Sequence, residues 1–129
     1  MKQLLLVTLL LLSVRPVYAE WMRAAQDEDG MTVYIDPDTI RLKRGLVRVW
    51  HLFEYKTAQT VMLRSFLSGK AHIEYDCAEE RSRYLAFAAF SDHMGSGEVV
   101  YSNPDERKWE PVEPESVGQI LWKAACGKK

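Results

Sequence analysis

Residues 71–77 read AHIEYDC and alternate between side chains suited to the inside and the outside of a sheet. The odd-numbered residues are Ala, Ile, Tyr and Cys, and the even-numbered residues are His, Glu and Asp. A two-residue period of this kind is typical of a half-buried antiparallel strand. We therefore expect a strand here, with Cys77 on its inner face.

The sequence on either side predicts further strands. Upstream, the alternation runs through Leu46–Tyr55, and because aromatic residues fall on both of its faces we expect this strand near the centre of the sheet. The other expected strands are Trp21–Gln26, Met31–Asp36, Ile40–Lys43, Arg81–Phe90 and Val99–Ser102. Turn signals lie at Asp27–Gly30, Asp36–Asp38 and Arg44–Gly45. Lys56–Gly69 and Ser91–Glu98 are expected to be loops.

The C-terminal segment carries the clearest helix signal. Ser116 and Gln119 have the spacing of a capping box. An apolar stripe follows at helical spacing, formed by Val117, Ile120, Leu121 and Ala124. Gly127 stands where a helix commonly ends. The fold class is therefore expected to be α+β, with a small antiparallel sheet of about six strands packed on one C-terminal helix and pinned by one disulfide.

The N-terminus has the pattern of a secretory signal peptide. A basic residue precedes an apolar run over residues 4–14, and Val17 and Ala19 are the small residues that a signal peptidase reads. A membrane anchor is the alternative, but the run is well short of the roughly 20 residues that cross a bilayer. We expect residues 1–19 to be cleaved, which leaves one domain at 20–129.

The expected mature chain is exported, and its composition limits its partners. A lipoprotein needs a cysteine directly after the cleavage site, but the first cysteine of this chain is Cys77, so a lipoprotein is not expected. We expect a periplasmic, cell-surface or secreted location. Cleavage removes two of the 17 basic residues and leaves 15 against 18 acidic residues. Because no basic stripe with interleaved aromatics is present, nucleic acid is not an expected partner. No transmembrane segment is expected in the mature chain.

Cys77 and Cys126 are the two cysteines of the chain, and export places them in an oxidising environment. A structural disulfide, a redox dithiol and half of a metal site are the possible roles. The chain lacks the CxxC spacing of a redox dithiol, and a structural zinc site needs four Cys or His ligands. A structural disulfide between helix and sheet is therefore expected.

The sequence offers no catalytic motif. Gly95-Ser96-Gly97 is one residue too short for a nucleophile elbow, and HExxH, P-loop and EF-hand patterns are absent. His51, His72 and His93 are scattered over different elements and are expected to be surface residues, not metal ligands. We expect no enzyme, no catalytic residues and no metal site.

Several segments together resemble the surface-adhesin protein E family. They are Val33–Ile40, Val47–Trp50, Tyr75–Arg81, Met94–Ser102, Trp109–Val112 and Ser116–Cys126. The resemblance implies a small antiparallel sheet packed on one helix, with a turn at Asp36–Pro37 and core positions at Trp50, Tyr75 and Trp122. It also implies the disulfide, a dimer at the bacterial surface, and binding of host matrix and plasma proteins, with haem as a further ligand.

The expected function is that of an exported, non-catalytic binding module with protein partners. One alternative is a periplasmic protein that binds haem, through His51, His72 or His93, or a small apolar ligand; another is a structural envelope protein. No ligand-binding residue is assigned. We expect partners to dock on the two loops, Lys56–Gly69 and Ser91–Gly97, with Tyr101 and Trp109 as possible aromatic anchors.

A homodimer is also expected. Leu46–Tyr55 has large apolar side chains on both faces, and one helix is too small to cover a sheet of about six strands. Self-association is the common remedy for an uncovered apolar face. The alternative is a monomer in which Lys56–Gly69 folds over that face.

Overall fold

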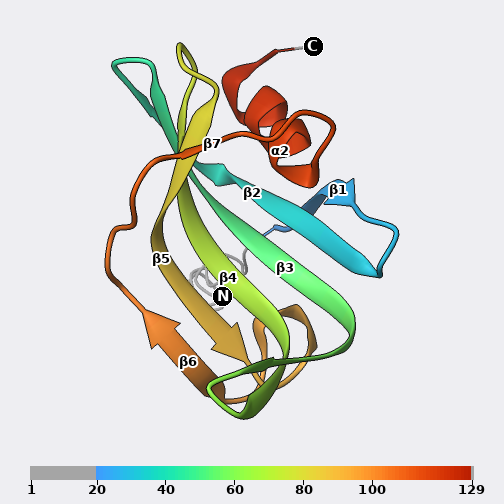
Figure 1. Cartoon of the computed structure of the whole chain (residues 1–129). Coiled ribbons are helices and arrows are strands. Elements are labelled where there is room, and N and C mark those ends of the chain that lie inside the picture. Colours follow the sequence, from blue (N-terminus) through green and yellow to red (C-terminus); the bar gives the residue numbers. More distant parts are fainter. Residues whose placement is uncertain (1–19, 129) are drawn as a thin grey trace, which may run out of the picture.

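The computed structural model describes residues 20–128, so the expected signal peptide at 1–19 lies outside the described residues. The elements in chain order are β1 (Met22–Gln26), β2 (Met31–Lys43), β3 (Leu46–Val61), β4 (Arg64–Asp76), β5 (Arg81–Phe90), the 3-10 turn η1 (His93–Gly95), β6 (Val99–Asn103), β7 (Glu110–Pro111) and α2 (Val117–Cys126). Figure 1 shows long strands, with α2 at one end of the sheet.

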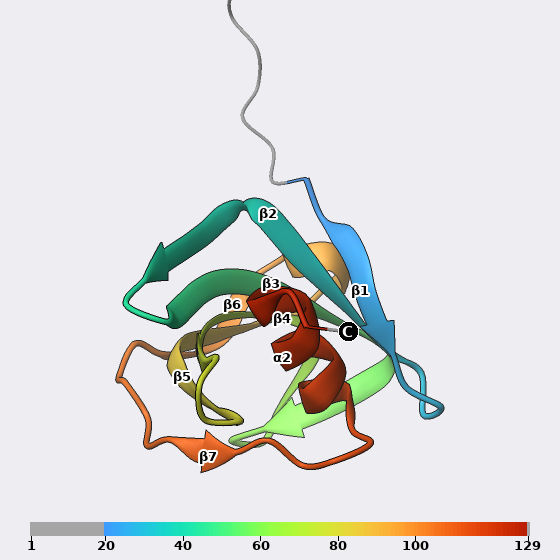
Figure 2. The same ribbon diagram turned by 90° about the horizontal axis from the view of Figure 1, so that it is seen from above.

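The strands form one antiparallel sheet in the order β1-β2-β3-β4-β5-β6, and β7 pairs with the other end of β5. The sheet curls strongly, as expected of a twisted antiparallel sheet, and α2 lies within its curve (Figure 2). We call the side that faces α2 the concave face and the opposite side the outer face. The α+β architecture predicted from the sequence is confirmed.

The core lies between the concave face and α2. The buried side chains of Val49, Ile73 and Tyr75 come from the two central strands, and Leu121 and Trp122 come from the helix. Burying these side chains removes apolar surface from water, which is the main stabilising term of the fold. The expected core positions at Tyr75 and Trp122 are confirmed.

A disulfide joins the two layers. Cys77 follows β4 and Cys126 ends α2, and their Cα atoms are 5.5 Å apart. Beside the bridge, the indole Nε1–H of Trp122 donates a hydrogen bond to the carbonyl oxygen of Asp76 at 2.8 Å. The predicted Cys77–Cys126 pairing is therefore present, and a hydrogen bond supports it at the same junction.

The turn expected at Asp36–Asp38 is instead a bulge inside one long strand, β2. Asp36 pairs with Trp50 and Arg41 with Arg48, so the extra residues are accommodated without ending the strand. The Thr39 hydroxyl donates to the Asp36 carbonyl and accepts the Trp50 N–H, which replaces the missing ladder partner. The expected strands Met31–Asp36 and Ile40–Lys43 are thus one.

The loop expected at Lys56–Gly69 is wrong, because this segment is the end of the β3–β4 hairpin. Its strands project beyond the core, so polar residues occur on both faces and hide the two-residue period. Val61 pairs with Arg64 across a two-residue turn. The hairpin bends across one end of the sheet (Figure 1), where Arg64 bonds to the Val100 carbonyl of β6 at 3.5 Å. The segment is therefore paired strand and not the covering loop of the monomer alternative.

The segment Ser91–Glu98, expected to be a flexible loop, packs on the outer face of the sheet. The Ser68 hydroxyl donates to the carbonyl of Asp92 at 2.6 Å and accepts the N–H of Gly95 at 2.8 Å. The turn lies over Leu52, which is fully buried. These contacts hold the loop in place.

The signals at the ends of α2 act as expected. Ser116 is the N-cap, and its hydroxyl accepts the Gln119 N–H at 3.1 Å. Gly127 adopts the left-handed conformation with φ of 66°, which ends the helix. Within residues 20–128, no helix has the length and hydrophobicity needed to span a membrane.

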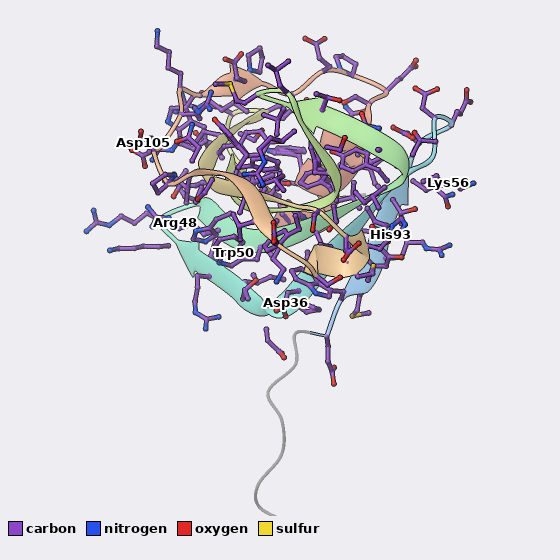
Figure 3. The ribbon with its side chains drawn as sticks, turned by 90° about the horizontal axis from the view of Figure 1, so that it is seen from below. Asp36, Arg48, Trp50, Lys56, His93 and Asp105 are labelled. Atoms are coloured by element: carbon purple, nitrogen blue, oxygen red, sulfur yellow. A yellow bond between two sulfur atoms is a disulfide. The ribbon has the colours of Figure 1, made fainter. Side chains whose placement is uncertain are left out.

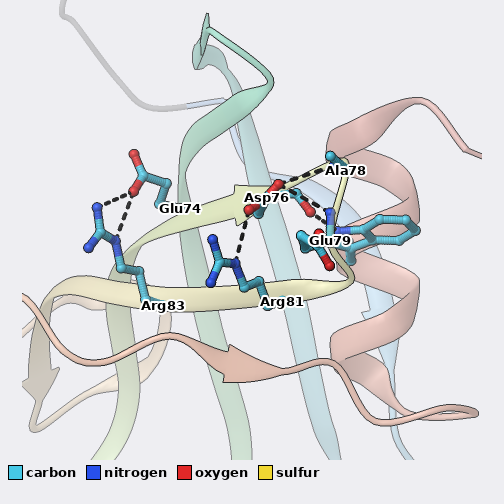
Figure 4. Close-up of polar contacts among 7 residues, drawn as sticks. Glu74, Asp76, Ala78, Glu79, Arg81 and Arg83 are labelled. Carbon is cyan, nitrogen blue, oxygen red and sulfur yellow. Dashed lines mark hydrogen bonds and ion pairs between the residues drawn. The ribbon is translucent and has the colours of Figure 1, made fainter.

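An ionic network on the outer face connects the strands β3, β4 and β5. The carboxylate of Glu74 is 2% exposed and accepts a bond from Arg48 at 2.7 Å. It also accepts bonds from Nε and Nη2 of Arg83 at 2.8 and 2.6 Å (Figure 4). Burial opposes the charged form of Glu74, but the two guanidinium groups outweigh it, so its pKa is lowered. Asp76 accepts a bond from Arg81 at 2.9 Å.

Candidate functional site

The concave face carries an aromatic groove beside α2. Two cavities, of about 300 and 320 Å³, share the side chains of Tyr55, Tyr84 and Phe87. One cavity extends beneath Leu121 of α2, and the other opens toward Arg107 in the segment between β6 and β7. We refer to the two cavities together as the aromatic groove.

A bulge in β5 builds this groove. Tyr84 pairs with Ile73 and Phe87 pairs with Ala71, and the register shifts by one residue between these pairs. In a regular strand, residues three apart point to opposite faces. The extra residue of the bulge puts Tyr84 and Phe87 on the same concave face.

Close packing between strands fixes the aromatic rings. The Phe87 ring lies over Gly69, where a Cβ atom would be 2.8 Å from the ring's Cε2. Phe87 also packs against Tyr101 of β6, with ring centroids 6.3 Å apart. Tyr55 meets Phe66 edge-to-face at 5.6 Å. The walls of the groove are therefore preformed, which lowers the entropic cost of binding.

The groove is lined by aromatic rings, and its polar groups include the neutral hydroxyls of Tyr55 and Tyr84. Burial raises the pKa values of the Tyr55 and Tyr84 phenols, so both stay protonated near neutral pH and can donate hydrogen bonds. Asp105 and Arg107 stand at the rim. Such a site suits an aromatic or aliphatic group that carries a hydrogen-bond acceptor.

His51 is buried and is not the surface residue expected from the sequence. Its exposed fraction is 0%, because it points from β3 into the core. Since the Tyr34 carbonyl can only accept, Nδ1 donates to it at 3.1 Å, and Nε2 accepts the Tyr75 hydroxyl at 2.7 Å. Desolvation lowers the His51 pKa to about 4, so the ring is neutral at physiological pH.

The structure does not bring the three histidines together. His72 lies half-buried on the outer face, where its ring stacks on Trp50 at 4.7 Å. His93 lies on η1, 3.2 Å from the Glu54 carboxylate, and Figure 3 shows it away from Trp50. Over residues 20–128, no cluster of three or more His, Cys, Asp or Glu side chains could hold a metal ion.

The expected aromatic positions have different roles from those assigned by sequence. Trp50 is on the outer face and not in the core, because its neighbour His51 takes the inward position on the same strand. Tyr101 borders the aromatic groove through its contact with Phe87. The face of Trp109 is covered by the guanidinium groups of Arg81 and Arg83, 4.6 and 4.4 Å from the ring centroid.

The tip of the β3–β4 hairpin is apolar and strained. Met62 and Leu63 have φ of 49° and 65°, a combination that normally selects Asn-Gly. Their exposed fractions are 77% and 99%. Apolar side chains in the left-handed region at full exposure favour neither stability nor solubility, so this tip is a second candidate for contact with a partner.

The double replacement Met62→Asn and Leu63→Gly is expected to stabilise the fold by about 1–2 kcal/mol, because asparagine and glycine adopt the left-handed conformation more readily than methionine and leucine do. Urea unfolding measures this change. Leu63→Ala is the matched control, since it removes the apolar group without relieving φ and should bring no gain. A double variant less stable than the native chain would contradict the assignment of strain.

The family model described as surface-adhesin protein E matches residues 21–127, which is nearly all of the described chain. The chain belongs to the surface-adhesin protein E family. No curated protein matches the chain.

Solved structures of a member of this family share the fold. Crystal form II of Haemophilus influenzae protein E superposes with a TM-score of 0.67 at 13% identity, covering 87% of this chain and 91% of that one. The selenomethionine form gives 0.64 at 13% identity, with coverage of 87% and 89%. A further structure of the protein gives 0.60 at 14%, with coverage of 88% and 92%. At these identities the likeness establishes the fold alone.

Membership of the surface-adhesin protein E family identifies the chain as an adhesin-like module and indicates an exported or surface location. The family model spans the whole sheet and α2, and with them the aromatic groove. The sequence did not predict Tyr84 and Phe87 as groove residues, because they share a face only through the β5 bulge. The density of apolar residues in Arg81–Phe90 was the available signal.

Proposed function

We propose that this member of the surface-adhesin protein E family is a non-catalytic binding module whose partners are proteins at the cell surface or in the periplasm. The aromatic groove carries the proposal. It presents Tyr55, Tyr84 and Phe87 on a rigid concave surface, with Asp105 and Arg107 at its rim. An apolar centre with a polar rim is the usual anatomy of a protein interface.

The groove has the residue types that dominate binding energy. Tyrosine provides large contact area and a hydrogen-bonding hydroxyl at low entropic cost, and it is enriched among interface hot spots. Tyr84 is 42% exposed although it lines both cavities, so a partner can reach it. A partner's aromatic or aliphatic side chain would enter the groove between Tyr84 and Tyr55.

Tyr84→Ala is expected to weaken binding to immobilised extracellular-matrix and plasma proteins by at least about tenfold, with a small effect on folding. Surface plasmon resonance measures the affinity, and circular dichroism checks the fold. Tyr34→Ala is the matched control, because Tyr34 lies on the outer face. Unchanged binding by Tyr84→Ala would move the docking site away from the groove.

A small apolar ligand is the second candidate, favoured by cavity volumes at the lower end of ligand sites. No histidine lines the groove, so a ligand held there would bind without His51, His72 or His93.

A haem titration followed at the Soret band distinguishes ligation by histidine from binding in the groove. A shift that the triple histidine variant abolishes supports ligation by histidine, and one that Tyr84→Ala abolishes supports binding in the groove. If neither protein nor apolar ligand binds, a structural envelope role is favoured.

The homodimer remains part of the proposal. The sheet ends in β1 and β6, each of which has one paired neighbour among the described strands, and Met22 on β1 is 59% exposed. Pairing of two β1 edges about a two-fold axis would satisfy the free backbone groups and cover Met22. We expect twice the chain mass by light scattering at micromolar concentration. Met22→Lys should shift the protein toward monomer, and a native mass near that of one chain would exclude the dimer.

A further inference from the structure

The outer face carries a second candidate site, at the turn end of the β2–β3 hairpin. Figure 1 shows this hairpin at the same end of the sheet as α2. The site is a cleft of about 500 Å³. Its charged and polar lining residues are Arg41, Lys43, Arg44, Arg48, His72 and Glu74. We refer to it as the basic cleft. Four cations face a single carboxylate here, in a chain whose formal net charge is −1.

The pairing of the strands concentrates this charge. Arg41 and Arg48 are directly opposite each other in the β2–β3 ladder, so they share a face. Lys43 lies two residues from Arg41 and points the same way. Like charges directly opposed across strands destabilise a sheet. An anion between these side chains would turn this repulsion into attraction.

The cleft's own carboxylate pairs with Arg48 and leaves Arg41, Lys43 and Arg44 without a counter-charge from it. Glu74 already accepts bonds from Arg48 at 2.7 Å and from Arg83 at 2.6 and 2.8 Å. Arg41 bonds through Nη1 to the carbonyl oxygens of Asp38 and Ile40, at 2.9 and 2.8 Å, which holds its guanidinium in place but brings no negative charge. Arg48 remains 50% exposed, and Nε is the only one of its nitrogens in the bond to Glu74. The cleft therefore contains preorganised cations with unused donors.

An aromatic wall adjoins the cations. Trp50 follows Arg48 on the same face of β3, and Figure 3 shows the two side by side. The Trp50 ring is stacked parallel to that of His72, which itself lines the cleft. The flat C–H faces of sugar rings pack on such surfaces while their charged substituents meet neighbouring cations. A recessed cleft admits single anionic groups more readily than the flat surface of a bilayer does.

From this arrangement we propose that the basic cleft binds the sulfate groups of a sulfated polysaccharide. Arg41, Lys43, Arg44 and Arg48 meet sulfate oxygens, and the Trp50–His72 stack flanks the sugar. This site goes beyond the protein-binding function proposed for the aromatic groove and lies on the opposite face of the sheet. The two sites therefore fail or hold independently.

The test measures binding of a heparin hexasaccharide to the full chain by isothermal titration calorimetry. The variant Arg41→Gln, Lys43→Gln, Arg44→Gln is expected to bind at least about tenfold more weakly, since it removes three of the cations. It leaves Arg48 and the buried Glu74 intact, so folding is spared. The control variant Arg23→Gln, Lys56→Gln, Lys128→Gln changes the net charge equally and should bind as the native chain does.

Three further measurements distinguish the source of the anion. Desulfated hexasaccharide should not bind, inorganic phosphate should compete only weakly, and vesicles of phosphatidylcholine with phosphatidylglycerol should not retain the protein. Equal loss of binding in the control variant, native binding by the cleft variant, or vesicle binding as strong as hexasaccharide binding would each overturn the proposal. Tyr84→Ala should bind the hexasaccharide normally, which separates this site from the groove.

Discussion

Replacing Cys77 and Cys126 with serine is expected to lower the free energy of unfolding by about 2–4 kcal/mol. The bridge closes a loop with a sequence separation of 49, for which the chain-entropy model gives about 4 kcal/mol. It also connects the end of α2 to the end of β4, so its loss frees the helix from the sheet. The thermal midpoint should fall by at least about 10 °C.

Differential scanning calorimetry measures this effect, and reduction of the native chain is its control. Native protein with its disulfide reduced by dithiothreitol should unfold at the midpoint of the double variant, because both lack the same cross-link. The hydrogen bond from Trp122 to the Asp76 carbonyl persists in both, so the helix should still dock at low temperature. A double variant that unfolds within a degree of the oxidised native chain would show that the bridge adds nothing.

Acidification from pH 6.5 to pH 4 is expected to remove about 3 kcal/mol of stability through His51 alone. Desolvation lowers the folded-state pKa of this ring to about 4, from 6.5 in the unfolded chain. Between these values the unfolded state binds the proton and the folded state does not, so stability falls as the pH falls. Protonation would also turn Nε2 into a donor facing the Tyr75 hydroxyl.

The carboxylates titrate in a lower range. The pKa of Glu74 is lowered from 4.5 because bonds from Arg48 and Arg83 outweigh the effect of burial. The pKa of Asp76 is lowered from 3.8 because backbone donors and Arg81 outweigh it. A lowered carboxyl pKa contributes stability that is present above the unfolded value and lost below it. Loss of stability above about pH 4.5 therefore reports on the two histidines whose pKa is lowered by burial, mainly on His51 and in smaller part on His72.

Urea unfolding at pH 6.5, 5.5 and 4.5 measures the His51 effect. His51→Gln, whose amide can accept the Tyr75 hydroxyl, should be less stable at pH 7 but should show a clearly shallower profile over this range, with the remaining slope coming from His72. An NMR titration of the native chain should show His51 neutral down to about pH 4. Equal slopes in the native chain and His51→Gln would contradict the assignment.

The sequence by itself determined the elements whose signals are local. Residues 71–77 predicted β4, because a two-residue period is set by backbone geometry and needs no distant partner. The capping residues Ser116 and Gly127 predicted both ends of α2, since they satisfy backbone groups within one turn. The helix and strand patterns, together with two cysteines in an exported chain, were enough to predict the α+β class and the disulfide.

The tertiary structure alone decided which residues share a face and where a ligand can enter. The β5 bulge turns Tyr84 and Phe87 to one side, and such a one-residue shift leaves no mark in the alternation of a segment that is apolar on both faces. His51 is buried and Trp50 is not, because the pairing of β3 with β2 and β4 fixes which of two adjacent residues meets the core. The cations of the basic cleft come together for the same reason. The sequence gives the chemistry of each side chain. The register between strands depends instead on contacts between distant segments, and these contacts exist only when the sheet has formed.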